Sequence, residues 1–236
     1  MLDPAKHRDE LLTILKDIYG DPEIRTALGF KGGTAAMLAY GLPRISVDLD
    51  FDLLDESKKT VAFEKVKTIL KQHGVLRKAS EKRYTLFFLM SYEKGQHTIK
   101  IDISKRRGLS EFHLRTYLGV PMLVMRQEDM TAGKLSALLT RKRFAMRDVF
   151  DLWFFLKNKW RVNETVLTEK TGLPVKKALQ QAIEKVRTIK KNQILDGLGE
   201  LLDPKQKAWA GDKLVEDTVF YLRLYKTSLP RQHLPK

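Results

Sequence analysis

The sequence contains no cysteine among its 236 residues. Disulfide scaffolds, thiol catalysis and cysteine-based zinc sites are therefore excluded. Histidine is also scarce, and the 5 histidines show no metal-ligand spacing. The most apolar short run, residues 86–90, falls far short of the roughly 20 residues that span a bilayer, and the charged first ten residues argue against a secretory signal. These absences predict a soluble, cytoplasmic protein with no membrane partner.

Acidic residues are outnumbered, with 29 Asp and Glu against 44 Lys and Arg, giving a formal net charge of +15. Such an excess favours a polyanionic partner, because basic side chains that neutralise phosphates release counterions. Nucleic acid is the first candidate and an acidic membrane surface the second. A third interpretation is a basic surface that only keeps the protein soluble. The 43% hydrophobic content is enough for a substantial core.

The apolar spacing changes character along the chain, from mixed helix and strand to helix alone, with a seam near residue 125. Strands are expected over 46–54, 83–92 and 97–104, with the last two joined by a turn at Lys94-Gly95. A helix is expected over 4–19, followed by a short helix that begins at Asp21. Further helices are expected over 34–40, 56–72, 127–141, 147–159, 175–190 and 211–225.

Alternating aspartates are the main chemical signal of the first part. In the segment 46–54, apolar residues alternate with Asp48, Asp50 and Asp52. On a strand, Asp48 and Asp50 would leave the same face roughly 7 Å apart at the backbone. Asp52 shares that face, but it lies near the strand end and we leave it outside a metal shell. The alternative is a solvent-facing strand decorated with acids.

A third carboxylate comes from the segment 97–104, whose alternation places Asp102 on the polar face of a strand that could pair beside the first. Three converging carboxylates repel one another unless a cation joins them, and their oxygen atoms suit Mg²⁺ (or Mn²⁺). This layout is that of two-metal phosphoryl transfer, in which one ion activates the attacking hydroxyl and the other stabilises the triphosphate. Asp102 is then the natural group to help activate the hydroxyl.

The sequence Gly32-Gly33-Thr34 lies just upstream of these acids. Glycines let backbone amides approach a phosphate closely, and Thr34 would begin a helix whose N-terminus favours anions. The alternative is an ordinary strand-to-helix turn. Arg44 and Ser46 fall between the glycines and the acids and could also contact phosphates, although a surface role for Arg44 is equally supported.

In the second part, Lys134 lies on a mostly apolar helix, where an inward-facing lysine needs an anionic partner. Asp148 and Asp151 are three residues apart and share one helix face. The alternative is an ordinary salt-bridged helix pair. The run 141–143 is interpreted as a solvated basic patch that can meet an RNA backbone.

The stretch from Phe30 to Asp52 resembles the AbiEii/AbiGii toxin family, within the DNA polymerase β-like nucleotidyltransferase superfamily. Ala132-Gly-Lys-Leu135 and Arg147-Asp-Val-Phe-Asp151 resemble the family's lysine-bearing helix and its later Arg/Lys-Asp-x-x-Asp motif. The resemblance covers roughly residues 28–155. It implies an α+β fold: a polymerase β-like core with a mixed sheet flanked by helices over residues 1–125, and an all-helical domain over 126–236 that completes the nucleotide site.

The resemblance also implies site roles and partners. Asp48 and Asp50 would be catalytic metal ligands, and Asp102 would be a third ligand, whose spacing matches the family's third carboxylate less closely. Lys134 would bind the triphosphate, and Asp148 would support Lys134 or act on the nucleophile. The nucleotide pocket would be lined by Gly32, Gly33, Thr34 and Ser46. The family implies NTP-dependent transfer by the toxin of a type IV toxin–antitoxin or abortive-infection pair, with a cognate antitoxin.

The leading hypothesis is a magnesium-dependent enzyme that moves NMP from an NTP to RNA, with tRNA preferred because of the basic charge. A second hypothesis is transfer to a protein or a small molecule, although the net charge of +15 argues against a cationic drug as acceptor. A third is a nucleic-acid-binding module without chemistry, against which Asp48, Asp50 and Lys134 argue because all three are intact.

Overall fold

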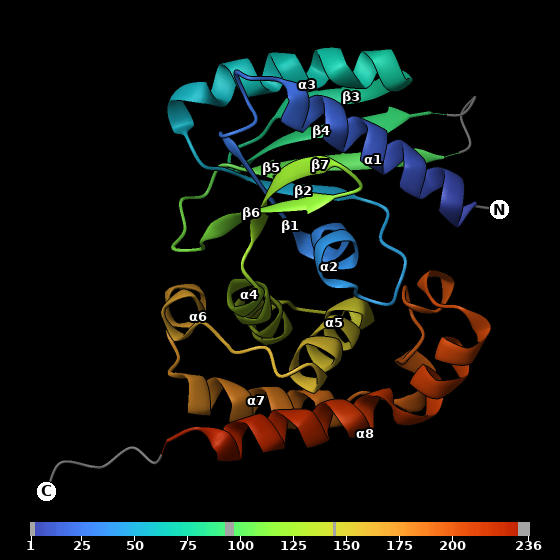
Figure 1. Ribbon diagram of the computed structural model, residues 1–236. Helices are drawn as coiled ribbons and strands as arrows, with labels where there is room; N and C mark the ends of the chain where they lie inside the picture. The colour runs from blue at the N-terminus through green and yellow to red at the C-terminus, as the bar shows by residue number, and fades with distance from the viewer. Residues whose placement is uncertain (1–2, 93–96, 144, 231–236) are drawn as a thin grey trace, which may run out of the picture. The chain divides into compact units, whose positions relative to one another are not determined.

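The computed structural model describes residues 3–92, 97–143 and 145–230 (Figure 1). The turn expected at Lys94-Gly95 lies outside the described residues. The chain divides into two compact units, Met1–Arg126 and Gln127–Lys236. This boundary lies beside the seam expected near residue 125.

The first unit contains a mixed seven-stranded sheet with the strand order β3-β4-β5-β2-β1-β7-β6. The strand β2 occupies the middle, antiparallel to β1 and parallel to β5. The strands are β1 (Leu28–Lys31), β2 (Leu49–Leu53), β3 (Val75–Glu81), β4 (Thr85–Ser91), β5 (Thr98–Ser104), β6 (Phe112–Tyr117) and β7 (Val120–Met125).

Helices cover both faces of this sheet. The helices α1 (Pro4–Gly20) and α3 (Lys59–His73) lie on one face and α2 (Gly32–Tyr40) on the other (Figure 1). The expected mixed sheet flanked by helices is thereby confirmed.

The face beneath α1 and α3 is apolar. Phe51 of β2 contacts Tyr19 of α1 with ring centroids 6.4 Å apart, and Phe88 of β4 contacts Phe63 of α3 at 5.1 Å. Each large apolar side chain buried here stabilises the fold by about 1.5–3 kcal/mol. Because side chains alternate along a strand, burial of this face leaves the aspartates of β2 and β5 on the other one. The fully buried strand residues of the apolar face include Leu49, Phe51, Phe88, Ile99, Ile101 and Ile103.

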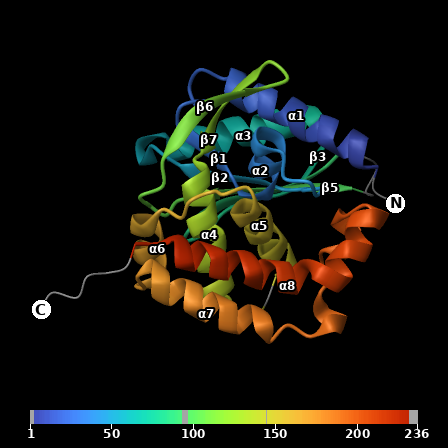
Figure 2. The ribbon, with the colours of Figure 1, turned by 60° about the horizontal axis from the view of Figure 1, so that its bottom comes forward.

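The second unit is helical, as expected (Figures 1 and 2). The long helix α8 packs against α5 and α7, and α4 packs against α5, α6 and α7. Aromatic contacts fill this unit: Trp153 of α5 lies 4.2 Å from Trp209 of α8, and Phe155 stacks on Trp160 at 4.2 Å between centroids. The helices are α4 (Gln127–Thr140), α5 (Met146–Lys157), α6 (Glu164–Thr171), α7 (Val175–Arg187) and α8 (Pro204–Ser228).

Several expected elements differ from the structure. The helix expected over 211–225 begins earlier and ends later, as α8 (Pro204–Ser228). The short helix expected from Asp21 is wrong, because residues 22–27 form turns. Asp21 still makes the contact expected of an N-cap, since its carboxylate accepts a hydrogen bond from the Glu23 amide at 2.9 Å. The expected helix over 56–72 opens with a 3₁₀ turn, η1 (Glu56–Lys58), before α3 begins. The expected strand over 46–54 begins only at Leu49, so Asp48 lies one residue ahead of it.

No helix within the described ranges is both long enough and apolar enough to cross a membrane.

Candidate active site

The polar face of β2 and β5 carries the aspartates that the sequence singled out. Asp50 and Asp102 are Cα partners in the parallel register, and Asp52 is the partner of Ser104. Paired strands lie about 4.8 Å apart, so Asp50 and Asp102 form a like-charged neighbouring pair. Asp48 joins this face from the loop ahead of β2, and its Oδ2 lies 3.0 Å from Nζ of Lys100 on β5.

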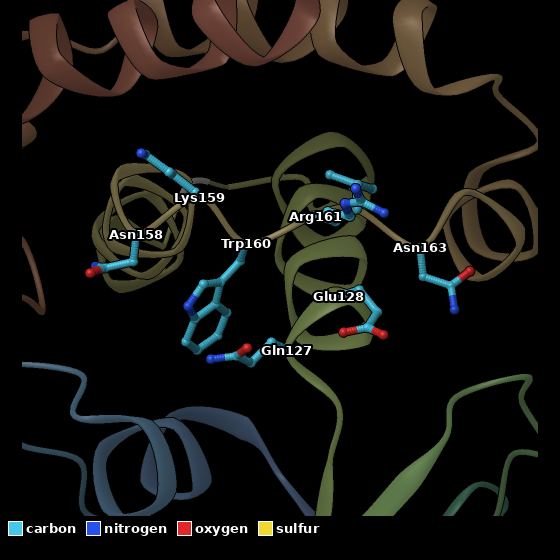
Figure 3. Close-up of a pocket in the computed structure, with 8 residues that line it drawn as sticks. Gln127, Glu128, Asn158, Lys159, Trp160, Arg161 and Asn163 are labelled. Atoms are coloured by element: carbon cyan, nitrogen blue, oxygen red, sulfur yellow. The ribbon is translucent and has the colours of Figure 1, made fainter. Parts of the chain in front are cut away.

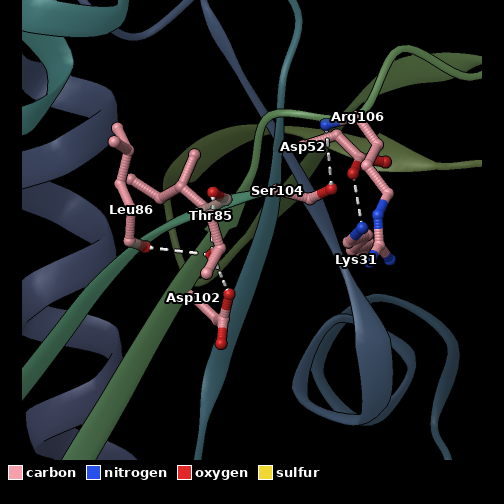
Figure 4. A network of polar contacts seen from close by, with 8 residues as sticks. Lys31, Asp52, Thr85, Leu86, Asp102, Ser104 and Arg106 are labelled. Atoms are coloured by element: carbon pink, nitrogen blue, oxygen red, sulfur yellow. Dashed lines mark hydrogen bonds and ion pairs between the residues drawn. The ribbon is translucent and has the colours of Figure 1, made fainter. Parts of the chain in front are cut away.

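The acids on this face have different partners (Figure 4). The Lys31 ammonium forms an ion pair with Asp52. The hydroxyl of Thr85, on β4, donates a hydrogen bond to Oδ1 of Asp102. Lysines therefore neutralise Asp48 and Asp52 on either side of the pair, whereas the Thr85 hydroxyl that binds Asp102 is a neutral donor.

The two glycines at the start of α2 let these side chains approach the helix. A Cβ on Gly32 would lie 2.6 Å from Oδ2 of Asp50, and a Cβ on Gly33 would lie 2.6 Å from Nη2 of Arg44 and 2.8 Å from Oγ of Ser46. Such distances leave no room for a side chain at either position. Both glycines belong to the helix, because α2 begins at Gly32 and not at Thr34 as expected.

Arg44 is only 5% exposed. Its guanidinium lies against Gly33, and its Nη1 donates a hydrogen bond to the carbonyl oxygen of Ile45 at 2.9 Å. The surface alternative for Arg44 is therefore wrong. A buried cation beside the first turn of a helix adds to the positive end of the helix dipole, which favours an anion at this place.

Thr34 is 1% exposed and acts inside the protein. Its hydroxyl donates to the carbonyl oxygen of Asp48 and lies 2.9 Å from Oγ of Ser46. A hydroxyl has one proton to donate, so Thr34 is already committed to holding the loop that carries Ser46 and Asp48. Thr34 therefore acts on the site by positioning that loop.

His7, on α1, holds the same loop from the other side. Its Nε2 lies 3.0 Å from the carbonyl oxygen of Val47, which can only accept, so Nε2 carries the proton. Its Nδ1 then accepts from the Tyr92 hydroxyl at 2.8 Å. Burial lowers the pKa of His7, which favours this neutral form. Sequence reasoning missed the role of His7, because a lone histidine in a helix has no distinguishing pattern.

In the second unit, Lys134 connects two carboxylates. Its Nζ lies 2.7 Å from Oδ1 of Asp148 and 2.7 Å from Oδ2 of Asp151. Both carboxylates are buried, with residue exposures of 2% and 0%, so these ion pairs between α4 and α5 are shielded from solvent. The alternative of a salt-bridged helix pair stays open beside the catalytic one. Arg141 Nη1 lies 2.7 Å from Oδ2 of Asp148, although the Arg141 side chain is 48% exposed. Residues 141–143 are all exposed, so the expected solvated basic run is confirmed, and its ion pair with Asp148 is an addition to it. The catalytic roles expected of Lys134 and Asp148 stay predictions.

The acidic face offers oxygen ligands of the kind that suit Mg²⁺ or Mn²⁺. Within the described ranges, however, no three or more His, Asp or Glu side chains form a group that could hold a metal ion. The neighbouring pair of Asp50 and Asp102 fits a metal site in which the protein supplies only two of the ligands. Magnesium is commonly bound in this way, by one or two carboxylates together with water and substrate phosphates.

Each unit also contains a cavity. The one in the second unit, of about 570 Å³, is lined by the first turn of α4 and the connection from α5 to α6, with Trp160 and Gln127 on one side and Glu128 and Arg161 on the other (Figure 3). It contains none of the predicted site residues. The cavity in the first unit, of about 650 Å³, begins at Asp52 and continues along residues 105–108. The acidic face therefore borders a hollow surface.

Known proteins share this architecture. The model of the nucleotidyl transferase AbiEii toxin family, type IV TA system, matches residues 13–213. The chain belongs to the AbiEii family. It is thus a nucleotidyltransferase of the toxin class found in type IV toxin–antitoxin systems, as the resemblance of the Phe30–Asp52 stretch predicted, and membership implies a cognate antitoxin.

Two solved structures show the same fold as this AbiEii-family chain. The crystal structure of a candidate nucleotidyltransferase from H. pylori is 21% identical, with 94% of this chain and 96% of that chain covered and a TM-score of 0.62. The crystal structure of JHP933 from Helicobacter pylori is 20% identical, with 95% of each chain covered and a TM-score of 0.57. A search of curated proteins found no match.

Proposed function

We propose that this AbiEii-family protein transfers NMP from an NTP to an RNA acceptor, preferably tRNA, with Mg²⁺ (or Mn²⁺) bound at Asp50 and Asp102. Asp48, which pairs with Lys100, lies beside this site. One observation supports this proposal most: Asp50 and Asp102 are neighbours in the sheet, and Asp50 contacts the first glycine of α2. A carboxylate pair beside a glycine-opened helix N-terminus offers both a cation site and a phosphate site.

In the proposed reaction, an RNA hydroxyl oxygen bonds to the α-phosphorus of the NTP, and the bond from that phosphorus to the bridging oxygen breaks, releasing pyrophosphate. Asp102 accepts the hydroxyl proton through Oδ2, since Thr85 donates to its Oδ1. The Gly33 amide and the Arg44 guanidinium bind and orient the phosphates. The divalent cation supplies charge neutralisation for the phosphates when it is bound.

Charge supports RNA as the acceptor. The net charge of +15 raises the local concentration of a polyanion and opposes the approach of a cationic drug. Transfer to a protein or a small molecule, and nucleic-acid binding without chemistry, are the alternatives that the same assay distinguishes.

The test incubates the protein with Mg²⁺, each α-labelled NTP in turn, and total tRNA. We expect label in the RNA, no transfer by Asp50→Asn, and near-normal transfer by Asp52→Asn, because Asp52 lies on the same strand face but is paired with Lys31. Label in a protein or in small molecules would support transfer to those acceptors instead of RNA. Tight RNA binding without transfer would support a nucleic-acid-binding protein without chemistry. Full activity of Asp50→Asn would disprove the carboxylate mechanism.

A further inference from the structure

Tyr84, in the connection from β3 to β4, is an exposed aromatic residue surrounded by cations. Tyr84 is 46% exposed to solvent. The guanidinium carbon of Arg83 lies 4.9 Å from the Tyr84 ring centroid, and that of Arg106 lies 4.6 Å from it. Beside them, the Lys82 ammonium lies 3.9 Å from the ring centroid of Phe87. We call Lys82, Arg83, Tyr84 and Arg106 the Tyr84 platform.

The cations of the platform have no carboxylate partner in the described part of the chain. Their neighbours differ: Lys59 and Lys105 share Glu81, and Arg107 pairs with Glu56. The acids of this region are therefore used by other bases. The guanidinium groups of Arg83 and Arg106 keep donors that no carboxylate of the described residues engages. A phosphate beside either one would accept charge-assisted hydrogen bonds from it.

The platform is connected to the acidic face of the same unit. Tyr84 precedes Thr85, whose hydroxyl donates to Asp102. Arg106 follows β5 and lies four residues beyond Asp102, which corresponds to about 13 Å of extended chain. Arg106 also lines the cavity of about 650 Å³ that begins at Asp52. Figure 4 shows Arg106 in the same close-up as Asp52 and Asp102.

We propose that the Tyr84 platform binds a single-stranded segment of the acceptor RNA, with an unpaired base stacked on Tyr84 and the adjacent phosphates on Arg83 and Arg106. This inference rests on the proposed function for the choice of RNA. A duplex would need only the charges, whereas an exposed aromatic ring among guanidinium groups suits unstacked bases. The platform lies close enough to Asp102 to hold the acceptor strand near the carboxylate that receives the hydroxyl proton.

The first test measures binding of a fluorescein-labelled RNA single strand of about 12 nucleotides, without NTP, at several salt concentrations. Tyr84→Ala is expected to weaken binding about tenfold, with an unchanged dependence of binding on salt concentration, while Tyr84→Phe retains binding because it keeps the ring.

The double variant Arg83→Ala/Arg106→Ala tests the phosphate contacts. It is expected to lower the slope of log binding constant against log salt concentration by about two, one for each lost phosphate contact. Arg77→Ala is the matched control. Arg77 is an exposed arginine of β3, and its neighbours Leu76 and Lys78 pair with β4 near the opposite end of that strand.

The proposal is overturned if the wild type does not bind the strand, or if the platform variants bind it like Arg77→Ala. It is also overturned if they bind RNA normally but lose binding to phosphatidylserine vesicles, since the platform would then face a membrane. Equal loss of single-strand and duplex binding in Tyr84→Ala would exclude base stacking.

A transfer assay separates this inference from the proposed function. If the wild type binds RNA through the platform without labelling it, the proposed function fails and the platform stands. If the wild type labels RNA and the platform variants keep its KM for RNA, the platform fails and the proposed function stands. A raised KM for RNA with an unchanged KM for NTP supports both.

Discussion

Gly32 and Asp50 fit together so closely that only hydrogen can occupy the side-chain position of residue 32. A Cβ there would lie 2.6 Å from Oδ2 of Asp50 and 3.1 Å from its Cβ. Gly32 also has a φ of 81°, in the region that favours glycine. The first residue of α2 thus fixes where one carboxylate of the acidic pair can lie.

Gly32→Ala is expected to displace the Asp50 carboxylate and to lower NMP transfer by at least tenfold. Gly41→Ala is a matched control, because Gly41 has a φ of 71° and nothing within 4 Å of an added Cβ. Both changes should cost about 1–2 kcal/mol of backbone strain in urea unfolding, but only Gly32→Ala should lose transfer activity. Equal activity of the two variants would contradict the close fit.

Magnesium is expected to stabilise the folded protein by binding at the acidic pair. At a concentration ten times its Kd, Mg²⁺ should add about 1.4 kcal/mol to the free energy of unfolding, because it binds the folded state only. Asp50→Asn should remove most of this increase, and Asp52→Asn should keep it, since Asp52 is paired with Lys31. Thermal unfolding with and without Mg²⁺ measures the effect. An equal magnesium response in Asp50→Asn and the wild type would place the metal elsewhere.

The buried ion pairs of Lys134 predict a strong coupling in the second unit. Lys134→Met leaves Asp151, which is 0% exposed, without this cation, and should cost about 3–5 kcal/mol. The double variant Lys134→Met/Asp151→Asn should recover at least about 1 kcal/mol of that loss, because Asp148 keeps Arg141 as a partner. Urea unfolding of the wild type, of Lys134→Met and Asp151→Asn alone, and of the double variant measures the coupling. Strictly additive losses would show that the contact carries no coupling energy.

His7 predicts a stability loss in mild acid. Burial lowers the pKa of His7 below its ordinary value of 6.5. Below about pH 6.5 the unfolded chain gains a proton at this residue while the folded chain stays neutral. The folded state then binds fewer protons, so the free energy of unfolding falls as the pH drops from 6.5 towards the folded-state pKa.

In His7→Gln this part of the pH dependence should disappear, because the amide can still donate to the Val47 carbonyl but does not titrate. The slope difference from the wild type should be at most about 1.4 kcal/mol per pH unit. Urea unfolding between pH 5 and pH 7 measures both slopes. Identical slopes would show that His7 does not titrate differently in the two states.

Part of the site could be predicted because its pattern is local. The alternation of apolar and acidic residues requires that Asp50 and Asp52 share a face once β2 forms, and the same argument places Asp102 on β5. The parallel pairing that makes Asp50 and Asp102 neighbours is a tertiary fact. It was expected only as one way in which the two strands could associate.

The remaining features leave no mark in a single sequence. An arginine such as Arg44 has the same local pattern whether it is exposed or buried against Gly33, and only the folded loop decides. The strand β3 was missed because it is mostly exposed and lacks the alternation of a half-buried strand. The ion pair of Arg141 with Asp148, 2.7 Å apart, is likewise a tertiary contact that nothing nearby in the sequence indicates.

The parallel pairing of β2 with β5 has a consequence for how this toxin is made. Asp50 and Asp102 become neighbours only after α3, β3 and β4 have been synthesised between them. Pairing over such a sequence distance forms late, because loop closure costs entropy before the contact is gained. A nascent chain on the ribosome that ends before β5 therefore lacks the neighbour of Asp50, and the acidic pair is assembled only after that strand has emerged.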